Sequence, residues 1–161
     1  MGFVRVGLSG RAFCLSVFLL DLHHMELQVG VKVLLKNPEG KYLLIRRSSE
    51  KYPEVGAKWD IVGGRIDPGS TLLENLKREI SEEVNLDLQD EPRLIAAQDI
   101  LRVAGRHVVR LTYVSSIKGE PRITDSDHSE WKWFTLQEIK NLNEKDLDSF
   151  FKELLDKGLF D

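Results

Sequence analysis

Apolar residues recur along the chain with two different periods, and the change of period marks the elements that the sequence predicts. Short runs rich in β-branched and aromatic residues, bounded by turn residues, predict strands. Apolar positions spaced three and four residues apart predict helices. The expected strands are residues 27–36, 41–47, 59–62, 93–103, 107–117 and 131–134, and the expected helices lie between residues 71 and 85, 135 and 139, and 144 and 157.

The order of these elements predicts one mixed domain. Strands and helices follow one another as β-β-β-α-β-β-β-α from Met25 onward, without an internal repeat or a linker. The segment 37–40 and Gly105 each separate two strands in the way that hairpin turns do. This arrangement favours an α+β or α/β sandwich built on a mixed β-sheet, with the domain covering residues 25–161.

Residues 1–24 do not share this patterning. Arg5 and Arg11 precede a mostly apolar stretch, residues 12–20, which loosely imitates a signal peptide. No small-x-small cleavage site follows it, and the stretch is too short to span a bilayer. We therefore expect residues 1–24 to be an N-terminal extension outside the domain, either ahead of a true start at Met25 or forming a short appended helix. An exported or membrane-tethered protein is the alternative that this stretch alone suggests.

Composition narrows the class of protein. The 161 residues suit a single domain, and 42% apolar residues suffice for an ordinary core. A formal net charge of −3 excludes binding to nucleic acid by bulk electrostatics. The single cysteine, Cys14, excludes an internal disulfide framework and a cysteine-rich zinc site. These features are typical of a cytoplasmic protein that has no nucleic-acid or membrane partner.

The stretch GGRIDPGSTLLENLKREISEEVNL, residues 63–86, carries the clearest local signals. Residues 67–70 fit a β-turn, and Thr71 and Glu74 form a capping box that begins a helix. Asn85 stands where that helix ends, in a position that favours a left-handed cap. One face of the helix is then apolar and expected to be buried, and it comprises Leu73, Leu76, Ile80 and Val84.

Three glutamates share a second face of this helix, next to the apolar face. Glu79, Glu82 and Glu83 repel one another, and a helix gains nothing from them without positive charge nearby. Because they adjoin the buried face, we expect them to be only partly exposed. Gly63 and Gly64 allow the backbone to approach a ligand closely. A hard divalent cation, Mg²⁺ or Mn²⁺, meets these conditions and favours chemistry on a diphosphate, whereas a solvated acidic face is the alternative for any such cluster.

The same stretch resembles the signature of the Nudix hydrolases, G-x(5)-E-x(7)-R-E-U-x-E-E-x-G-U, in which U is an aliphatic residue. Seven of the nine fixed positions are matched, and the wider resemblance extends from Glu26 to Leu155. It implies an α/β/α sandwich that cleaves nucleoside diphosphates linked to another group with the help of Mg²⁺ or Mn²⁺. The matching residues are Gly64, Arg78, Glu79, Ile80, Glu82, Glu83 and Leu86.

Two positions depart from the signature. Asn85 replaces its second glycine, and a left-handed cap at Asn85 makes that change nearly harmless. Ser70 replaces its first glutamate, which in the family helps to anchor the signature through the arginine. We expect Glu74 to take over part of the pairing with Arg78. The change at Ser70 leaves the principal metal ligands in place, and we expect it to affect the rate of catalysis.

The resemblance also implies roles for the site residues. The three glutamates are metal ligands that hold the cation against the diphosphate, Glu82 is also a catalytic residue, and Arg78 braces them. Arg46 and Arg47 close a strand at the edge of the expected cleft, where one of them alternates inward toward phosphate. Trp59 could stack on a base, but an aromatic residue in this setting is more often part of the core. The expected substrate contacts are Arg46, Arg47, Trp59, Gly63 and Gly64.

The general base is expected in the loop 124–130, which carries three carboxylates and His128. Alignment with the MutT-like base position brings Asp127 near it, but Glu130 has the longer reach, and we favour Glu130. Glu79 on the helix is next in line. His128 is expected to orient a phosphate or to stay solvated, and a flexible polar loop is the alternative for the whole segment.

Substrate choice leaves a weaker signal. In the family, ADP-ribose members tend to carry a proline shortly after the signature and dinucleoside polyphosphate members a tyrosine, and residues 97–106 contain neither. This absence favours a MutT-like (d)NTP pyrophosphohydrolase that releases a nucleoside monophosphate and pyrophosphate. An ADP-ribose or nucleotide-sugar pyrophosphatase and a weakly active nucleotide-binding sensor are the alternatives. Dimers are common in the family, so a homodimer is one expectation for the assembly.

Overall fold

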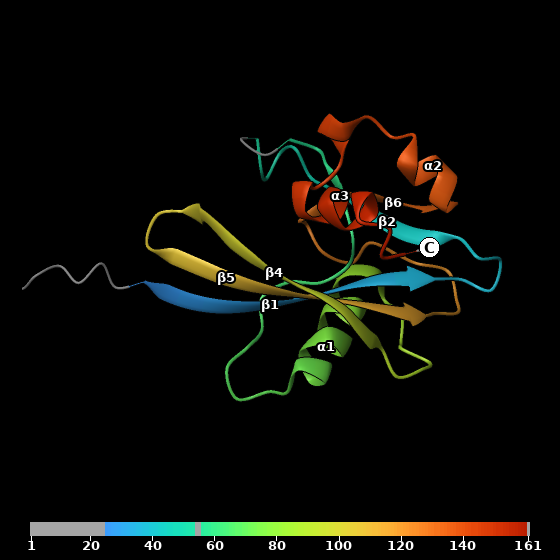
Figure 1. The fold of residues 1–161 in the computed structure, drawn as a ribbon. Coiled ribbons are helices and arrows are strands. Elements are labelled where there is room, and N and C mark those ends of the chain that lie inside the picture. The colour runs from blue at the N-terminus through green and yellow to red at the C-terminus, as the bar shows by residue number, and fades with distance from the viewer. Residues whose placement is uncertain (1–24, 54–55, 161) are drawn as a thin grey trace, which may run out of the picture.

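The computed structural model describes residues 25–53 and 56–160, and the expected extension, residues 1–24, lies outside them. Within the described residues the chain forms strands, α-helices and one short 3-10 helix, labelled in Figure 1 where there is room. In chain order these are β1 (Glu26–Lys36), β2 (Tyr42–Arg47), β3 (Trp59–Asp60), α1 (Leu72–Val84), β4 (Arg93–Val103), β5 (Arg106–Ser116), β6 (His128–Phe134), α2 (Leu136–Lys140), η1 (Glu144–Asp146) and α3 (Ser149–Asp156).

The strands form one mixed sheet, as the order of elements predicted. The sheet has the order β3-β2-β1-β5-β4, and β6 pairs with β2 outside this path. β1 and β5 run parallel from Glu26 opposite Arg106 to Lys36 opposite Ser116. The remaining strand pairs are antiparallel.

The edge of β1 that faces β2 changes its partner along its length. β1 pairs with β2 at one end of the strand, where Lys36 lies opposite Tyr42. Further back, Val33 bridges to Val62 and Gly30 bridges to Arg65. These bridges bring the two glycines at positions 63 and 64 directly against β1.

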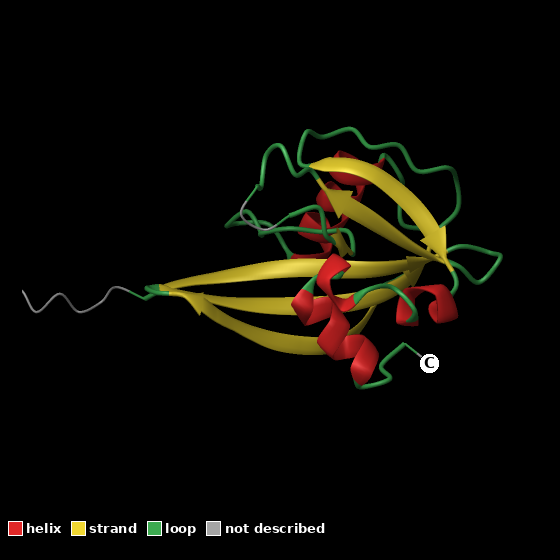
Figure 2. Cartoon of the chain, turned by 90° about the horizontal axis from the view of Figure 1, so that it is seen from above, coloured by secondary structure: helices red, strands yellow, loops and turns green. Residues whose placement is uncertain are grey.

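Helices cover both faces of the sheet, with α1 on one face and α2 and α3 on the other (Figures 1 and 2). Neighbouring residues of β1 point to opposite faces, so Leu34 packs against α2 and α3 while Val33 and Leu35 pack against α1. The core therefore has two apolar layers, which confirms the predicted α+β sandwich. The buried helical side chains are Ile139, Phe151, Leu154 and Leu155 on one side and Leu76, Ile80 and Val84 on the other.

Both ends of α1 follow the local signals. The hydroxyl of Thr71 accepts a hydrogen bond from the Glu74 N–H at 3.2 Å, and the Glu74 carboxylate accepts one from the Thr71 N–H at 2.7 Å. The Ser70 N–H donates to the Asp67 carbonyl, which closes the predicted turn. Asn85 ends the helix in the left-handed conformation, with φ 53°. The predicted capping box and left-handed cap are confirmed.

The buried face of α1 differs from the prediction in its first turn. Leu73 was expected to be buried but is 39% exposed. Asn75 is buried instead, because its amide donates to the carbonyls of Ser70 and Thr71 while its oxygen accepts from the Asp67 N–H. The first turn thus packs against its own entry loop, and that contact selects a polar side chain.

The prediction of a single helix from residue 144 to residue 157 is wrong. An extended pair, Leu147 and Asp148, separates η1 from α3. Leu147 forms a parallel bridge with Trp59, and the Asp148 N–H donates to the Trp59 carbonyl at 2.8 Å. The Asp148 carboxylate then caps α3 by accepting from the N–H groups of Phe150 and Phe151. This contact with β3 is nonlocal, and helical spacing does not report it.

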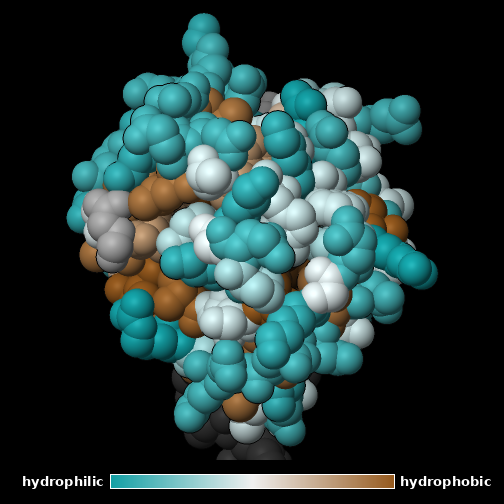
Figure 3. All heavy atoms as spheres, turned by 90° about the vertical axis from the view of Figure 1, so that its right-hand side faces the viewer, coloured by the Kyte–Doolittle hydropathy of each residue, from teal (hydrophilic) through white to brown (hydrophobic). Residues whose placement is uncertain are grey.

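The surface is mostly hydrophilic on the face that Figure 3 displays, with hydrophobic patches between the polar side chains. Scattered exposed apolar residues of this kind are normal for a folded domain. Within the described part of the chain, none of the helices has the length and apolar character needed to cross a membrane.

The cap at Asn85 yields a test of the fold. A residue with a β-carbon pays a steric penalty in the left-handed region unless it is Asn or Asp, so Asn85→Ala should lower the free energy of unfolding by about 1–2 kcal/mol. Asn85→Gly is the matched control, and it should keep the parent value to within about 0.5 kcal/mol. Urea unfolding of the three proteins measures both values. Equal losses in the two variants would contradict the role of the left-handed cap.

Candidate functional site

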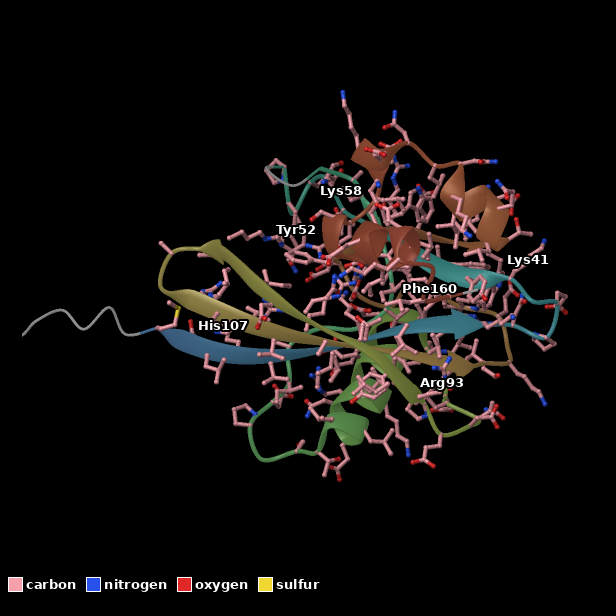
Figure 4. The ribbon with its side chains drawn as sticks, viewed as in Figure 1. Lys41, Tyr52, Lys58, Arg93, His107 and Phe160 are labelled. Carbon is pink, nitrogen blue, oxygen red and sulfur yellow. The ribbon has the colours of Figure 1, made fainter. Side chains whose placement is uncertain are left out.

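A cavity of about 430 Å³ lies where β1, β2, the glycine pair and α1 meet. Its charged lining is mixed, since carboxylates of α1 face cations of the sheet across the same space. A larger cavity of about 600 Å³ lies near Arg93 and Phe160, toward the right of the view in Figure 4, away from the acidic helix. We take the smaller cavity as the candidate site because the buried carboxylates of Glu79 and Glu83 line it. Its lining includes Lys32, Arg47, Glu79, Glu83, Asp127 and His128.

The glycine pair lets α1 approach the sheet closely at this cavity. The Gly63 N–H donates a hydrogen bond of 2.7 Å to Oε2 of Glu83. Gly63 has φ 126°, and a β-carbon there would lie 2.1 Å from the Val31 carbonyl oxygen. A β-carbon on Gly64 would lie 2.6 Å from the Glu79 carboxylate. A side chain at Gly63 would clash with the backbone of β1, and one at Gly64 would displace the Glu79 carboxylate.

Two carboxylates of α1 are buried at the cavity. Glu79 and Glu83 are 8% and 7% exposed, which is less than the partial exposure that the sequence predicted. Burial raises the pKa of Glu83 to about 8, although Lys32 and the Gly63 N–H oppose the rise. Burial also raises the pKa of Glu79, against the opposing effect of Arg78. The pair therefore favours positive charge in the cavity, and a divalent cation supplies it.

Arg78 braces the acidic face. Its guanidinium donates at 2.7 Å to both Glu79 and Glu82 and at 2.9 Å to the Arg65 carbonyl. Its Nε lies 3.1 Å from a carboxylate oxygen of Asp67. The predicted pairing of Arg78 with Glu74 is wrong, because the Glu74 carboxylate is bound by Thr71 in the capping box. Asp67 supplies the negative partner instead.

Glu82 stands apart from the other two glutamates. Its side chain is 58% exposed and pairs with Arg78, and it does not line the cavity. The structure thus brings together Glu79 and Glu83 of the expected metal ligands and leaves Glu82 on the rim. Its expected roles as a metal ligand and catalytic residue stay predictions.

A buried carboxylate that the sequence analysis did not identify organises the cations. Asp60, at the end of β3, lies 3.1 Å from Lys32, 3.2 Å from Arg47 and 3.3 Å from Arg110. Burial alone would raise the pKa of Asp60, but these three cations hold it below its ordinary value. Arg110 is bound in turn to Asp148 at 2.7 Å. One signal was available, since Lys32 is the one charged residue inside the apolar run 27–35.

Of the two arginines at the end of β2, Arg47 lines the cavity and Arg46 does not. Arg46 pairs with Glu130 at 2.7 Å and donates to the Ala57 carbonyl. Its guanidinium also lies 5.6 Å from the centre of the Trp59 ring. The structure therefore brings Arg47 to the site, as the alternation along the strand predicted for one of the pair, and it places the expected substrate contact Arg46 elsewhere.

Trp59 is a core residue. It is 8% exposed and packs edge-on against Phe134, with ring centres 5.2 Å apart and an interplanar angle of 80°. Its ring belongs to the apolar layer beneath α2 and α3. The expectation that Trp59 stacks on a base is wrong, because β3 directs this side chain into the core and away from the cavity.

Glu130 is also displaced from its expected place. β6 begins at His128, so Glu130 lies on a strand and its carboxylate, 49% exposed, pairs with Arg46 outside the cavity. A bulge opposite Arg46 and Arg47 changes the register between Glu130 and His128. Because of that bulge, His128 enters the cavity and Glu130 does not. The structure therefore does not bring the favoured general base, Glu130, to the site, and its catalytic role stays a prediction.

Asp127 and His128 reach the site from the start of β6, where Asp127 directly precedes the strand and His128 is its first residue. Asp127 accepts a hydrogen bond of 2.7 Å from the hydroxyl of Tyr52, a residue labelled in Figure 4, and it also pairs with Lys51. These bonds lower the pKa of Asp127. The His128 side chain is 8% exposed, which excludes the solvated alternative, and it bonds to Asp125 at 2.9 Å. Glu83, Asp125 and His128 place ligand atoms within 4.8 Å of one another, a grouping that the sequence analysis did not anticipate.

Comparison with known proteins gives consistent matches. The family model described as NUDIX domain matches residues 26–156. A Mycobacterium tuberculosis protein provisionally named 8-oxo-dGTP diphosphatase 2 is 30% identical over 91 residues, which are 56% of this chain and 63% of that relative. The match therefore spans less than two thirds of the relative's length.

Solved structures show the same fold. A MutT protein from Methanosarcina mazei Go1 has a TM-score of 0.70 and 23% identity, over 81% of this chain and 91% of that one. A MutT NUDIX hydrolase from Burkholderia pseudomallei has a TM-score of 0.67 and 26% identity, over 81% of this chain and 97% of that one. The NUDIX domain of Shewanella oneidensis NrtR, complexed with ADP ribose, has a TM-score of 0.67 and 18% identity, over 83% and 86%.

Burial of Glu83 yields a pH test. Between the ordinary pKa of 4.5 and the folded value of about 8, the folded protein holds a proton that the unfolded chain has released. The parent should therefore lose stability as pH rises through this range, because the unfolded state then binds fewer protons. The Glu83→Gln variant has no proton to release at this position, so it should lose less stability as pH rises.

Thermal unfolding of both proteins in a chelating buffer, from pH 5 to pH 8.5, measures the difference. Added Mn²⁺ should restore the stability of the parent at the higher pH and have a smaller effect on the variant. Identical pH dependence in the two proteins would show that burial does not raise the pKa of Glu83.

Proposed function

The chain belongs to the NUDIX domain family, and on that premise we propose that it is a hydrolase that cleaves the diphosphate linkage of a nucleoside diphosphate derivative with a divalent cation, Mg²⁺ or Mn²⁺. One observation carries the proposal. Two buried carboxylates, Glu79 and Glu83, face two cations, Lys32 and Arg47, across one cavity. A diphosphate with its cation matches this arrangement, because it needs acidic ligands on one side and positive charge on the other.

Some residues of the cavity would bind the cation, and others would bind the diphosphate. Glu79 and Glu83 would hold the cation, and Arg78 would keep their carboxylates in place through its bonds to Glu79 and the Arg65 carbonyl. Lys32 and Arg47 would bind phosphate oxygens while Asp60 fixes their positions. A bound cation supplies charge neutralisation at the phosphoryl oxygens and lowers the pKa of a bound water.

The proton acceptor is assigned among the carboxylates that line the cavity. Asp127 is a poor acceptor, because the bonds from Lys51 and Tyr52 lower its pKa. Burial raises the pKa of Glu79, which brings that carboxylate closer to the pH at which it can take a proton efficiently. We therefore propose that Glu79, the alternative that the sequence placed next in line, takes the proton, and that Glu83 is the principal ligand of the cation.

For the substrate we propose a (d)NTP that is cleaved to a nucleoside monophosphate and pyrophosphate. In this reaction water supplies an oxygen to one phosphorus atom while the bond from that phosphorus to the bridging oxygen breaks. The Mycobacterium tuberculosis relative, provisionally named as a diphosphatase acting on 8-oxo-dGTP, supports this class. The lack of proline and tyrosine in residues 97–106 supports it as well. Oxidised and ordinary purine triphosphates are the first compounds to test.

A substrate panel tests the proposed function. Purified protein should be incubated with dGTP, 8-oxo-dGTP, ATP, ADP-ribose and a nucleotide sugar, each with Mg²⁺, with Mn²⁺ and with a chelator, and the products separated by chromatography. We expect metal-dependent release of pyrophosphate from at least one triphosphate and none with chelator. A folded protein that binds a nucleotide but turns over none of the panel would support a sensor instead.

A pair of matched substitutions tests the roles of two glutamates. Glu83→Gln keeps the shape of the side chain but removes charge from the cavity, so turnover should fall by at least about a hundredfold. Glu130→Gln makes the same chemical change outside the cavity and should keep turnover to within about threefold. Steady-state rates at saturating metal measure both. Near-normal turnover in a folded Glu83→Gln protein would refute the assignment.

A further inference from the structure

His128 is held in a fixed orientation by its neighbour Asp125. The Nδ1 atom of His128 lies 2.9 Å from Oδ2 of Asp125. The backbone N–H groups of Asp127 and His128 both donate to Oδ1 of the same carboxylate, at 3.1 and 3.0 Å. Because a carboxylate only accepts, Nδ1 carries the proton, and the lone pair of the neutral imidazole is on Nε2.

That lone pair faces Glu83. The Nε2 atom lies 3.8 Å from Oε1 of Glu83, which is longer than a hydrogen bond. The other oxygen of Glu83 is already bound by the Gly63 N–H. The two side chains are 8% and 10% exposed, and neither Nε2 nor Oε1 hydrogen-bonds to any residue that the structure describes. The Nε2 lone pair and an oxygen of Glu83 that lacks a hydrogen-bond partner among the described residues thus face each other in a largely buried position.

Building on the proposed function, we propose that Nε2 of His128 is a nitrogen ligand of the divalent cation, shared with Oε1 of Glu83, and that Asp125 is the positioning residue. Metal bonds of about 2.1 Å to each atom accommodate a separation of roughly 3 to 4 Å between them. A metal-binding histidine characteristically donates its other ring N–H to a carboxylate, as His128 does to Asp125.

A nitrogen ligand changes which cations the site prefers. Mg²⁺ favours oxygen ligands and retains its waters. Imidazole binds later transition metals more strongly, and affinity rises from Mn²⁺ to Co²⁺. The site should therefore bind Co²⁺ and Zn²⁺ more tightly than a site built only from carboxylates, relative to its affinity for Mg²⁺.

The direct test observes the nitrogen itself. Protein labelled with nitrogen-15 in histidine should be titrated with Zn²⁺ and followed by NMR through the imidazole nitrogens. His107 is the matched control, because its Nε2 also pairs with an aspartate, Asp99, at 2.7 Å on a different part of the sheet. Zn²⁺ should shift the Nε2 signal of His128 strongly and leave that of His107 unchanged, with His128→Gln and His107→Gln supplying the assignments.

Affinities provide the second readout. Calorimetric titration should show that His128→Gln weakens Co²⁺ binding by about 10- to 100-fold, whereas Mg²⁺ binding weakens by less than about threefold. His107→Gln should change neither affinity. Asp125→Asn keeps the imidazole but weakens its positioning, so it should lower Co²⁺ affinity by less than His128→Gln does.

An unshifted Nε2 signal at saturating Zn²⁺ would overturn the inference, as would an equal loss of Co²⁺ and Mg²⁺ affinity in His128→Gln. The NMR titration uses the parent protein, so the outcome does not depend on whether a variant folds. A shifted nitrogen in a protein that hydrolyses no substrate would refute the proposed function and leave the nitrogen ligand standing. Hydrolysis by a protein whose Nε2 signal does not shift would support the proposed function and refute the nitrogen ligand.

Discussion

The hydrogen bond from the Gly63 N–H to the Glu83 carboxylate is the contact on which the rest of the site depends. Gly63 can lie against the backbone of β1 because it has no side chain, and Gly64 leaves the space that the Glu79 carboxylate occupies. The same approach removes the carboxylates of Glu79 and Glu83 from water, which raises the pKa of each. Close packing therefore makes ionisation of these buried carboxylates unfavourable unless a cation lies beside them.

The positive side of the cavity is built on an equally buried group. Asp60 is almost fully enclosed and holds Lys32 and Arg47 at its surface-facing side, while Arg110 and Asp148 complete the network behind it. Lys32 lowers the pKa of both Asp60 and Glu83, so it links the cationic network to the acidic helix. The acidic residues of α1 and the cations held by Asp60 together place a cation site next to an anion site. A metal-bound diphosphate needs this arrangement.

Local features of this protein could be predicted from sequence, and nonlocal ones could not. The ends of α1 depend on residues within four positions of each other, so Thr71, Glu74 and Asn85 predicted them correctly. Strand alternation predicted that one of Arg46 and Arg47 points inward, and the structure shows that Arg47 does. By contrast, the break before α3 depends on contact between β3 and Leu147, which are far apart in the chain.

The same distinction applies to the candidate site. The exclusion of Glu130 results from a bulge that only strand pairing reveals. Asp67 replaces Glu74 as the partner of Arg78 because the turn before α1 folds back toward it. The charge of Lys32 inside an apolar run indicated a buried partner, but no residue near Asp60 in the sequence identifies Asp60 as that partner. The family signature identified Glu79 and Glu83, and the fold determined which other groups join them.

Anomalous diffraction from crystals soaked in Mn²⁺ tests the central claim most directly, because it locates the cation without relying on activity. The account predicts a peak inside the cavity, within about 2.5 Å of a Glu83 carboxylate oxygen and beside the Gly63–Gly64 backbone. A peak found only at exposed carboxylates such as Glu82, or no peak in the cavity at saturating Mn²⁺ with a nucleotide present, would contradict it.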